Sequence, residues 1–194
     1  MAVPVRRASD WQTGSRRQHA PLPMNILRYL RSDCIRLSLD HRPVATPEEE
    51  TTAQRANRLA AEKEAVLGEL AEILENSGQI NNPSKFLRDL INREKKATTA
   101  IIPGVAIPHV RSMQVKEFVM GFARADAPGV FFDCPDGHPT RFFFLLASPP
   151  YEDRLYLQVY REFATVLQDE ESLELLATAA EPNDVFNALR RHFR

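Results

Sequence analysis

An unbroken apolar run in the second half of the chain limits the fold more than any other feature. Residues 142–147 read F-F-F-L-L-A, and Pro149 and Pro150 end the run. Successive side chains of a strand point to opposite faces, so a strand that is apolar at every position needs cover on both sides. The run is far shorter than the roughly 18 residues that a membrane-spanning helix needs. We therefore expect a buried central strand with helices packed on both of its faces.

Periodic apolar residues elsewhere in the chain predict the helices that supply this cover. Apolar side chains recur at helical spacing in five segments: residues 55–76, 85–95, 151–168, 172–179 and 183–192. A short helix is expected close to Met24. Strand-like patterns occur at residues 34–40, 101–110, 117–125 and 130–132. This order predicts an α/β fold, a three-layer helix–sheet–helix sandwich with a central mixed β-sheet.

Length, charge and cysteine content narrow the class of protein. The 194 residues fit one domain with an appendage. Lys and Arg number 25 against 26 Asp and Glu, so the basic excess of a nucleic-acid-binding protein is absent. Cys34 and Cys134 lie far apart and show no metal-ligand spacing, which favours free thiols and leaves a disulfide as the alternative. We expect no metal, no cofactor, no nucleic-acid partner and no insertion into a membrane.

The N-terminal residues 1–23 differ in composition from the rest of the chain. They hold four arginines and one acidic residue, and they contain no apolar segment of the kind found in secretory signals. We interpret them as a disordered basic tail or an over-long start, and their shortage of acids also fits a transit peptide. The folded domain is therefore predicted to span residues 24–194.

Residues 93–109 carry the best candidate for chemistry. They read R-E-K-K-A-T-T-A-I-I-P-G-V-A-I-P-H. Pro108 fixes its own φ and favours an extended conformation at Ile107, so His109 is expected at a stiff strand end. Two polar residues, Arg93 and Thr99, precede it in the chain. The plain alternative is a structural histidine, with Arg93 as a surface charge at a helix end. His41, by contrast, lies in a polar loop where we expect it to be exposed.

The same residues resemble a known signature. The segment is similar to the enzyme IIA domain of the fructose/mannitol class of the bacterial phosphotransferase system (PTS), a class that includes the nitrogen-regulatory branch. That family pattern reads roughly R-E-x-x-x-S/T-T-G-I-x-x-G-x-A-I-P-H. The residues that match it are Arg93, Glu94, Thr98, Thr99, Ile101, Gly104, Ala106, Ile107, Pro108 and His109. The likeness extends over about residues 24–194.

The resemblance implies a phosphoryl carrier in the cytoplasm. His109 is expected to accept phosphate from phospho-HPr and to pass it to a IIB domain, or to hold it as a signal to a regulatory target protein. An unperturbed histidine is already about three-quarters neutral at pH 7, so a cation that lowers its pKa gains only about 0.2 kcal/mol. A donor aimed at transition-state charge is worth roughly 3–4 kcal/mol. We therefore expect Arg93, helped by Thr99, to bind phosphoryl oxygens.

Two departures from the family pattern affect the expected activity. Ala100 replaces a glycine, so the backbone there must avoid left-handed φ. Tyr156 stands where the family usually has a second histidine, and it cannot carry positive charge near neutral pH. Tyr156 is either a hydrogen-bond donor at the second site or an ordinary helix residue. The loss of the histidine favours a regulatory role of the nitrogen type, and a IIA-like binding module without transfer activity is the alternative.

An apolar contact surface for HPr is also expected around His109. Phe118, Met113 and Val110 are the residues that the sequence suggests for this surface.

Overall fold

The computed structural model describes residues 25–43, 47–167 and 169–192. The elements in chain order are η1 (Ile26–Tyr29), β1 (Leu30–Arg36), α1 (Thr52–Glu75), α2 (Pro83–Lys96), β2 (Ala100–Ile102), β3 (Val105–Ala106), β4 (His109–Arg111), β5 (Val119–Arg124), β6 (Phe142–Ser148), α3 (Asp153–Val166), α4 (Glu170–Thr178) and α5 (Pro182–Arg190). None of the described helices is both long and apolar enough to cross a membrane. The tail predicted at residues 1–23 lies outside the described residues.

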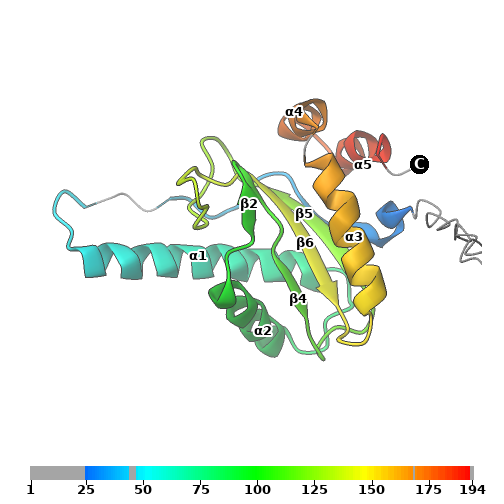
Figure 1. Ribbon diagram of the computed structural model, residues 1–194, viewed down its shortest axis with the longest axis horizontal. Coiled ribbons are helices and arrows are strands. Elements are labelled where there is room, and N and C mark those ends of the chain that lie inside the picture. The colour runs from blue at the N-terminus through cyan, green and yellow to red at the C-terminus, as the bar shows by residue number, and fades with distance from the viewer. Residues whose placement is uncertain (1–24, 44–46, 168, 193–194) are drawn as a thin grey trace, which may run out of the picture.

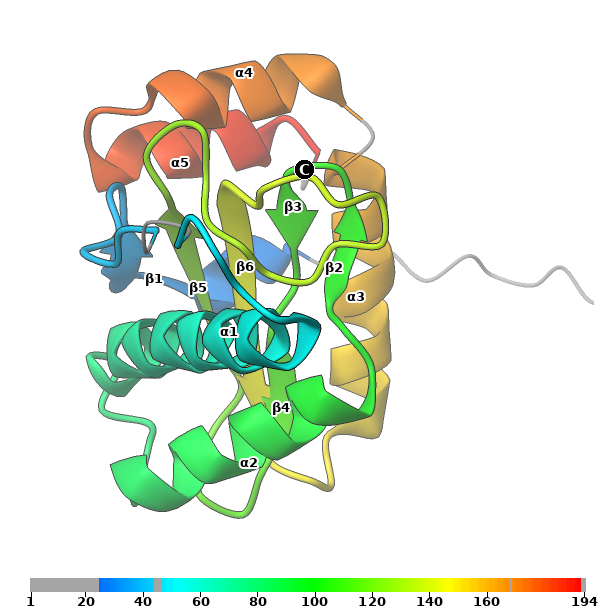
Figure 2. The ribbon, with the colours of Figure 1, turned by 90° about the vertical axis from the view of Figure 1, so that its left-hand side faces the viewer.

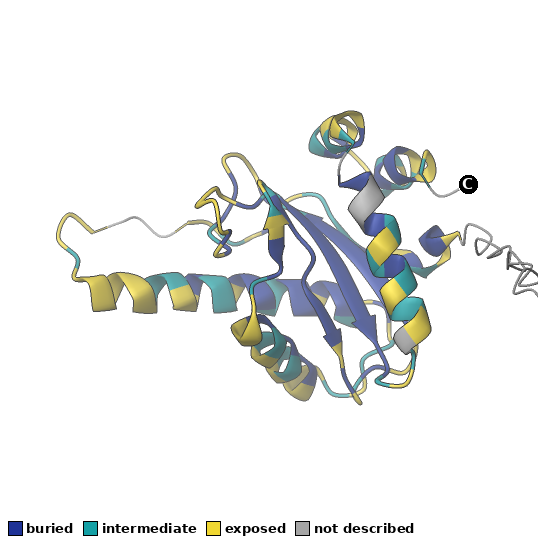
Figure 3. Cartoon of the chain, in the orientation of Figure 1, coloured by how far each residue is buried: buried dark blue, intermediate teal, exposed yellow. Residues whose placement is uncertain are grey.

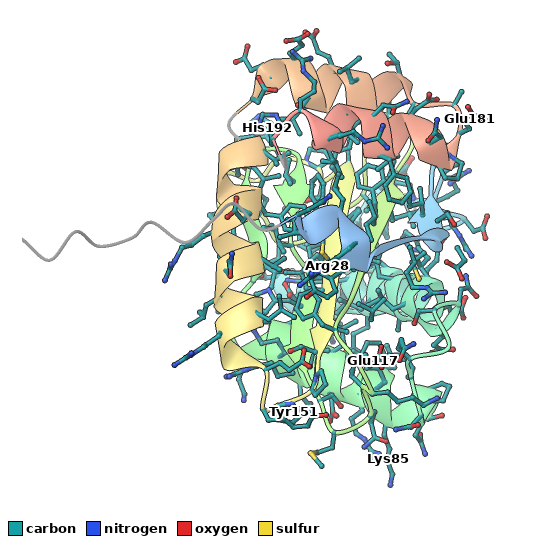
Figure 4. All side chains as sticks on the ribbon, turned by 90° about the vertical axis from the view of Figure 1, so that its right-hand side faces the viewer. Arg28, Lys85, Glu117, Tyr151, Glu181 and His192 are labelled. Carbon is teal, nitrogen blue, oxygen red and sulfur yellow. The ribbon has the colours of Figure 1, made fainter. Side chains whose placement is uncertain are left out.

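Helices cover both faces of one mixed sheet, which confirms the predicted three-layer sandwich. The strand order is β1-β5-β6-β3-β2, and β4 also pairs with β6. β5 runs antiparallel to β6, whereas β3 and β4 run parallel to it along the same edge. α1 and α2 lie on one side of the sheet and α3 on the other, while α4 and α5 lie at one end (Figures 1 and 2). In Figure 4, η1 lies beside α3 on the second face.

The apolar run forms β6, and it is buried on both faces as predicted. All seven residues of the strand are buried, and Figure 3 shows the strands beside it mostly buried. Phe143, Leu145 and Ala147 belong to the core beneath α1 and α2. The alternate residues, Phe142, Phe144 and Leu146, belong to the core shared with η1, α3, α4 and α5. One strand therefore joins two separate cores.

Local signals set the ends of the helices that position the site. The side chain of Thr51 accepts a hydrogen bond from Gln54 N at the start of α1, and the helix stops before Gly78, whose φ is +70°. Asn82 caps α2 by accepting a hydrogen bond from Lys85 N, and Pro83 occupies the first turn. The predicted helices therefore exist, with ends that differ by a few residues.

Two predicted strands are wrong in position or extent. The strand expected at 34–40 is β1 at Leu30–Arg36, because an irregularity between Leu30 and Ile35 interrupts the apolar–polar alternation that the sequence pattern relies on. The strand expected at 130–132 is reduced to a single bridge between Val130 and Thr140. Neither change affects the order of the layers.

His41 is not exposed as expected. The carboxylate of Glu69 on α1 accepts hydrogen bonds from the backbone N atoms of Asp40 and His41, at 2.6 and 3.0 Å. This holds the turn against α1 and leaves the ring of His41 mostly covered, 3.8 Å from Glu62. Cys34 and Cys134 are both buried free thiols, so the disulfide alternative is wrong.

Candidate functional site

His109 is the first residue of β4 at the edge of the sheet, directly after Pro108, and the residue is buried, with 7% exposure. Its Nδ1 lies 2.7 Å from the carbonyl oxygen of Ile107. A carbonyl can only accept a hydrogen bond, so Nδ1 carries the proton and donates it. The lone pair is therefore on Nε2. The backbone fixes both the orientation of this ring and its tautomer, which leaves Nε2 as the nucleophilic atom.

Arg93 contacts that same nitrogen. Its Nε donates a hydrogen bond to Nε2 of His109 at 3.1 Å, and one of its terminal nitrogens donates to the carbonyl of Ala97 at 2.9 Å. Arg93 lies in the last turn of α2, where a basic side chain interacts favourably with the helix dipole. The guanidinium therefore covers the lone pair of His109.

Burial lowers the pKa of His109 to about 4. The hydrogen bond to Ile107 opposes this shift, and the positive charges of Arg93 and Arg111 add to it. The imidazole is consequently neutral throughout the physiological pH range. Loss of solvent, and not the neighbouring cation, is the main cause of the lowered pKa of His109.

Two tyrosines of α3 pack their rings against His109. The ring centroids of Tyr156 and Tyr160 lie 5.6 and 5.5 Å from that of His109, each in an edge-to-face arrangement. Burial raises the pKa of Tyr156 to about 12, so its hydroxyl keeps its proton. Sequence reasoning missed Tyr160, although its spacing of four residues from Tyr156 places both on one helix face.

Thr99 contacts the buried carboxylate of Glu94 and not the imidazole of His109. Its hydroxyl donates to Glu94 at 2.7 Å, its backbone N donates to the same side chain at 2.9 Å, and its carbonyl accepts from the backbone N of Ile107 at 2.9 Å. Lys63 of α1 forms an ion pair with Glu94 at 2.8 Å. Thr99 and Glu94 thus hold the segment before His109 in place. The R-E pair of the motif could have indicated Glu94, whereas no sequence signal pointed to Lys63.

The surroundings of His109 differ from the expected apolar surface. Met113 is 74% exposed, but Val110 and Phe118 are buried in the cores and cannot belong to a contact surface. A cavity of about 530 Å³ lies between α1, α2 and the loop at 131–133. It is lined by Lys63, Glu94 and Thr98 among others, and His109 is not part of its wall. The site at His109 therefore suits contact with another macromolecule better than enclosure of a small substrate.

Ala100 fits its position without strain. It begins β2 and pairs with Ala106 in extended conformation. The turn that follows uses Gly104, whose φ is +77°. The replacement of glycine by alanine therefore leaves the course of the motif intact.

Comparison with known proteins agrees with this geometry. The family model described as "Phosphoenolpyruvate-dependent sugar phosphotransferase system, EIIA 2" matches residues 50–192. A fructose-specific EIIABC component of Bacillus subtilis is 27% identical over 138 residues, which are 71% of this chain and only 22% of that protein. A nitrogen regulatory protein of Bradyrhizobium diazoefficiens is 30% identical over 134 residues, 69% of this chain and 86% of that protein.

A solved structure shows the same arrangement of elements. The nitrogen regulatory protein IIA-Ntr from Neisseria meningitidis superimposes with a TM-score of 0.65 at 25% identity, covering 84% of this chain and 97% of that chain. The match of the family model covers well over half of the chain, and the signature contains the oriented histidine and the arginine that contacts it. The chain belongs to the EIIA 2 family of the phosphoenolpyruvate-dependent sugar phosphotransferase system.

Proposed function

We propose that this protein is a phosphoryl carrier whose His109 accepts a phosphoryl group from a phosphohistidine on HPr. The observation that carries the proposal is the hydrogen bond from Nδ1 of His109 to Ile107, because it leaves the lone pair of a neutral imidazole on Nε2, beside Arg93. Imidazole is a competent nucleophile near neutral pH without a separate general base. The position of His109 at a sheet edge, outside the neighbouring cavity, supports a protein as donor.

In the proposed step, Nε2 attacks phosphorus while the bond from phosphorus to the donor imidazole breaks. The electron pair of that bond returns to the donor ring, and the proton on Nδ1 of His109 stays in its hydrogen bond to Ile107. Arg93 first leaves Nε2 and then binds the oxygens of the travelling group. Since His109 is already neutral, Arg93 gains nothing further by lowering its pKa, whereas a donor to transition-state charge is worth roughly 3 kcal/mol.

Thr99 is assigned to the site as a positioning residue. The proposed contact of its hydroxyl with phosphate requires that the hydroxyl leave Glu94, to which it donates a hydrogen bond. Its backbone contact with Ile107 supports the orientation of the carbonyl that binds His109.

The downstream role that we favour is regulatory. A phosphoryl group on His109 brings about two negative charges to this surface, of which the ring offsets one while Nδ1 keeps its proton, and this change in charge alters which protein binds there. The likeness to nitrogen regulatory proteins supports a signalling role, and the likeness to a fructose-specific EIIABC component supports transfer to a IIB domain as the second route. Tyr156 favours signalling, because a protonated phenol cannot share a proton with the donor or acceptor imidazole.

We also propose that the domain begins before the region matched by the family model. Ile26, Leu27 and Leu30 are buried in the core beneath α3, and β1 pairs with β5. A unit that starts near residue 24 and continues to the C-terminal helix therefore keeps both cores closed, with residues 1–23 as an added segment.

Phosphorylation by a reconstituted system tests the function. We expect incubation with phosphoenolpyruvate, enzyme I and HPr to add about 80 Da, one phosphoryl group, to the intact protein. His109→Gln should abolish the gain and Arg93→Ala should slow it by about a hundredfold, whereas the exposed His138→Gln should behave as wild type. Absence of labelling, in conditions where another IIA domain is labelled, would contradict the carrier. It would favour a IIA-like module that binds a partner without transfer.

A further inference from the structure

A second arginine shares the face of β4 on which His109 lies. Residues two apart on a strand point to the same side, and Val110 between them belongs to the core under α1 and α2. His109 and Arg111 therefore both face α3. The guanidinium carbon of Arg111 lies 5.7 Å from the ring centroid of Tyr156, whose ring meets that of His109 at 5.6 Å. Tyr156 thus packs between the histidine and the second cation.

The three oxygens of the proposed phosphoryl group can bind a second cation besides Arg93. A phosphoryl group on Nε2 carries close to two negative charges, and the ring gains one positive charge while Nδ1 keeps its proton. Arg93 supplies one positive charge in contact with that nitrogen. The carboxylate of Glu94 is held by Lys63 and Thr99. A second cation that can reach the same phosphoryl group would bind oxygens that Arg93 does not bind.

We propose that Arg111 is the second phosphate-binding cation of this site, held beside His109 on the ring of Tyr156. This inference rests on the proposed phosphorylation of His109. Arg111 is exposed, so its guanidinium can turn from the tyrosine ring towards a phosphoryl group on Nε2. Arginine is suited to this role because its planar fork binds phosphate oxygens in pairs and stacks on aromatic rings.

The role of Tyr156 follows from that of Arg111. An aromatic ring attracts a guanidinium within about 6 Å of its centroid and restricts where that cation can rest. Tyr156 is therefore a positioning residue for Arg111, and the feature that matters is its ring. Together, Arg111 and Tyr156 bring a positive charge to the place where the family usually has a second histidine. Tyr156 alone is neutral there.

Rates of phosphorylation test this assignment with two phosphoryl donors. The first is phospho-HPr and the second is phosphoramidate, a small donor that loses ammonia when an imidazole attacks its phosphorus. With both donors we expect Arg111→Gln to slow labelling of His109 by about tenfold, less than a directly bound donor group would. Arg111→Lys should recover part of the rate, and Arg161→Gln, an exposed arginine of α3, should not change it.

Variants of Tyr156 separate positioning from packing. Tyr156→Phe keeps the ring and should react at close to the wild-type rate, whereas Tyr156→Leu should be as slow as Arg111→Gln. The double variant Arg111→Gln with Tyr156→Leu should be no slower than either single change, because both remove the same interaction. Additive losses would overturn the proposal, since a tyrosine that only packs against His109 acts independently of Arg111.

Other outcomes separate this inference from the proposed function. If His109 of the wild type is labelled by either donor and Arg111→Gln reacts within twofold of it, the role of Arg111 is wrong while the carrier stands. If Arg111→Gln is slow with phospho-HPr alone, Arg111 contacts the donor protein and does not bind the phosphoryl group. If neither donor labels the wild type at His109, the proposed function itself fails.

Discussion

At the scale of single residues, the tautomer, the hydrogen bonding and the burial of His109 depend on three contacts of different kinds. The carbonyl of Ile107 sets the tautomer, Arg93 covers the lone pair, and the rings of Tyr156 and Tyr160 remove solvent. Because removal of solvent is the largest cause of the lowered pKa, the imidazole stays neutral even without a cation beside it. The role that we propose for Arg93 therefore concerns the phosphoryl group and not the preparation of the nucleophile.

The titration of His109 tests this division of roles. NMR of the imidazole should give a midpoint about 4, against about 6.5 for an unperturbed histidine. Arg93→Ala should move the midpoint only slightly, since burial causes most of the shift. The unfolded chain binds the proton more tightly, so the histidine's contribution to stability is complete above pH 6.5. It should fall by roughly 3 kcal/mol as pH drops towards 4.

His109→Gln provides the control for this titration, because it identifies the resonance and should remove that part of the pH dependence of unfolding. A midpoint close to 6.5 in the folded wild type would show that the ring is hydrated, which contradicts the packing against the two tyrosines.

At the scale of elements, the end of α2 serves two sides of the protein at once. Arg93 extends to His109, whereas its neighbour Glu94 is buried against Lys63 of α1 and holds Thr99. Successive residues of a helix point about a quarter-turn apart. The end of α2 can therefore hold the motif in place through Glu94 and also bring Arg93 to His109. The position of α2 against α1 therefore decides where the guanidinium of Arg93 lies.

Removing the cation of the buried pair tests the link between α1 and α2. Lys63→Met leaves the carboxylate of Glu94 without its ion-pair partner in a buried position, which should lower the free energy of unfolding by about 3 kcal/mol. Lys95→Met is the matched control, because its pair with Glu64 joins the same two helices at an exposed position and should be worth less than about 1 kcal/mol. Urea unfolding measures both, and equal losses would contradict the anchoring role of Lys63.

At the scale of the whole molecule, β6 contributes alternate residues to both cores and so connects them. Phe143 packs against Phe132 on the α1 and α2 side, with ring centroids 5.1 Å apart. Phe144 packs against Phe122 and Phe163 on the α3 side, at 5.3 and 5.0 Å. Because these neighbours alternate on a single strand, neither core can open without disturbing the other. We expect the domain to unfold as one cooperative unit.

Alanine substitutions on the two faces of β6 test this cooperativity. Phe143→Ala and Phe144→Ala should each lower the free energy of unfolding by about 3–5 kcal/mol, from lost burial and the cavity that remains. Both should shift one common transition when circular dichroism and tyrosine fluorescence are followed in urea. The exposed Met113→Ala should change stability by less than about 0.5 kcal/mol. Two separate transitions in either phenylalanine variant would show that the cores unfold independently.

Sequence patterns were sufficient wherever a residue's role depends on its near neighbours in the chain. The period of apolar residues predicted the helices, the run at 142–147 predicted a strand covered on both faces, and the signature at 93–109 indicated the family. Local prediction failed for β1, because an irregularity in its pairing with β5 interrupts the alternation that identifies a strand. It also failed for His41, whose burial depends on Glu69 from a distant helix.

The sequence by itself determined the layer order, the family and the candidate histidine, because these follow from local periodicity and from the spacing of a continuous motif. Only the tertiary structure decided which atom of His109 is available, how far burial lowers its pKa, and which residues surround it. Tyr160, Arg111 and Lys63 enter the site or its support from α3, β4 and α1. Contacts between elements that are distant in the chain leave no periodic signal, since they depend on how the layers pack against the sheet.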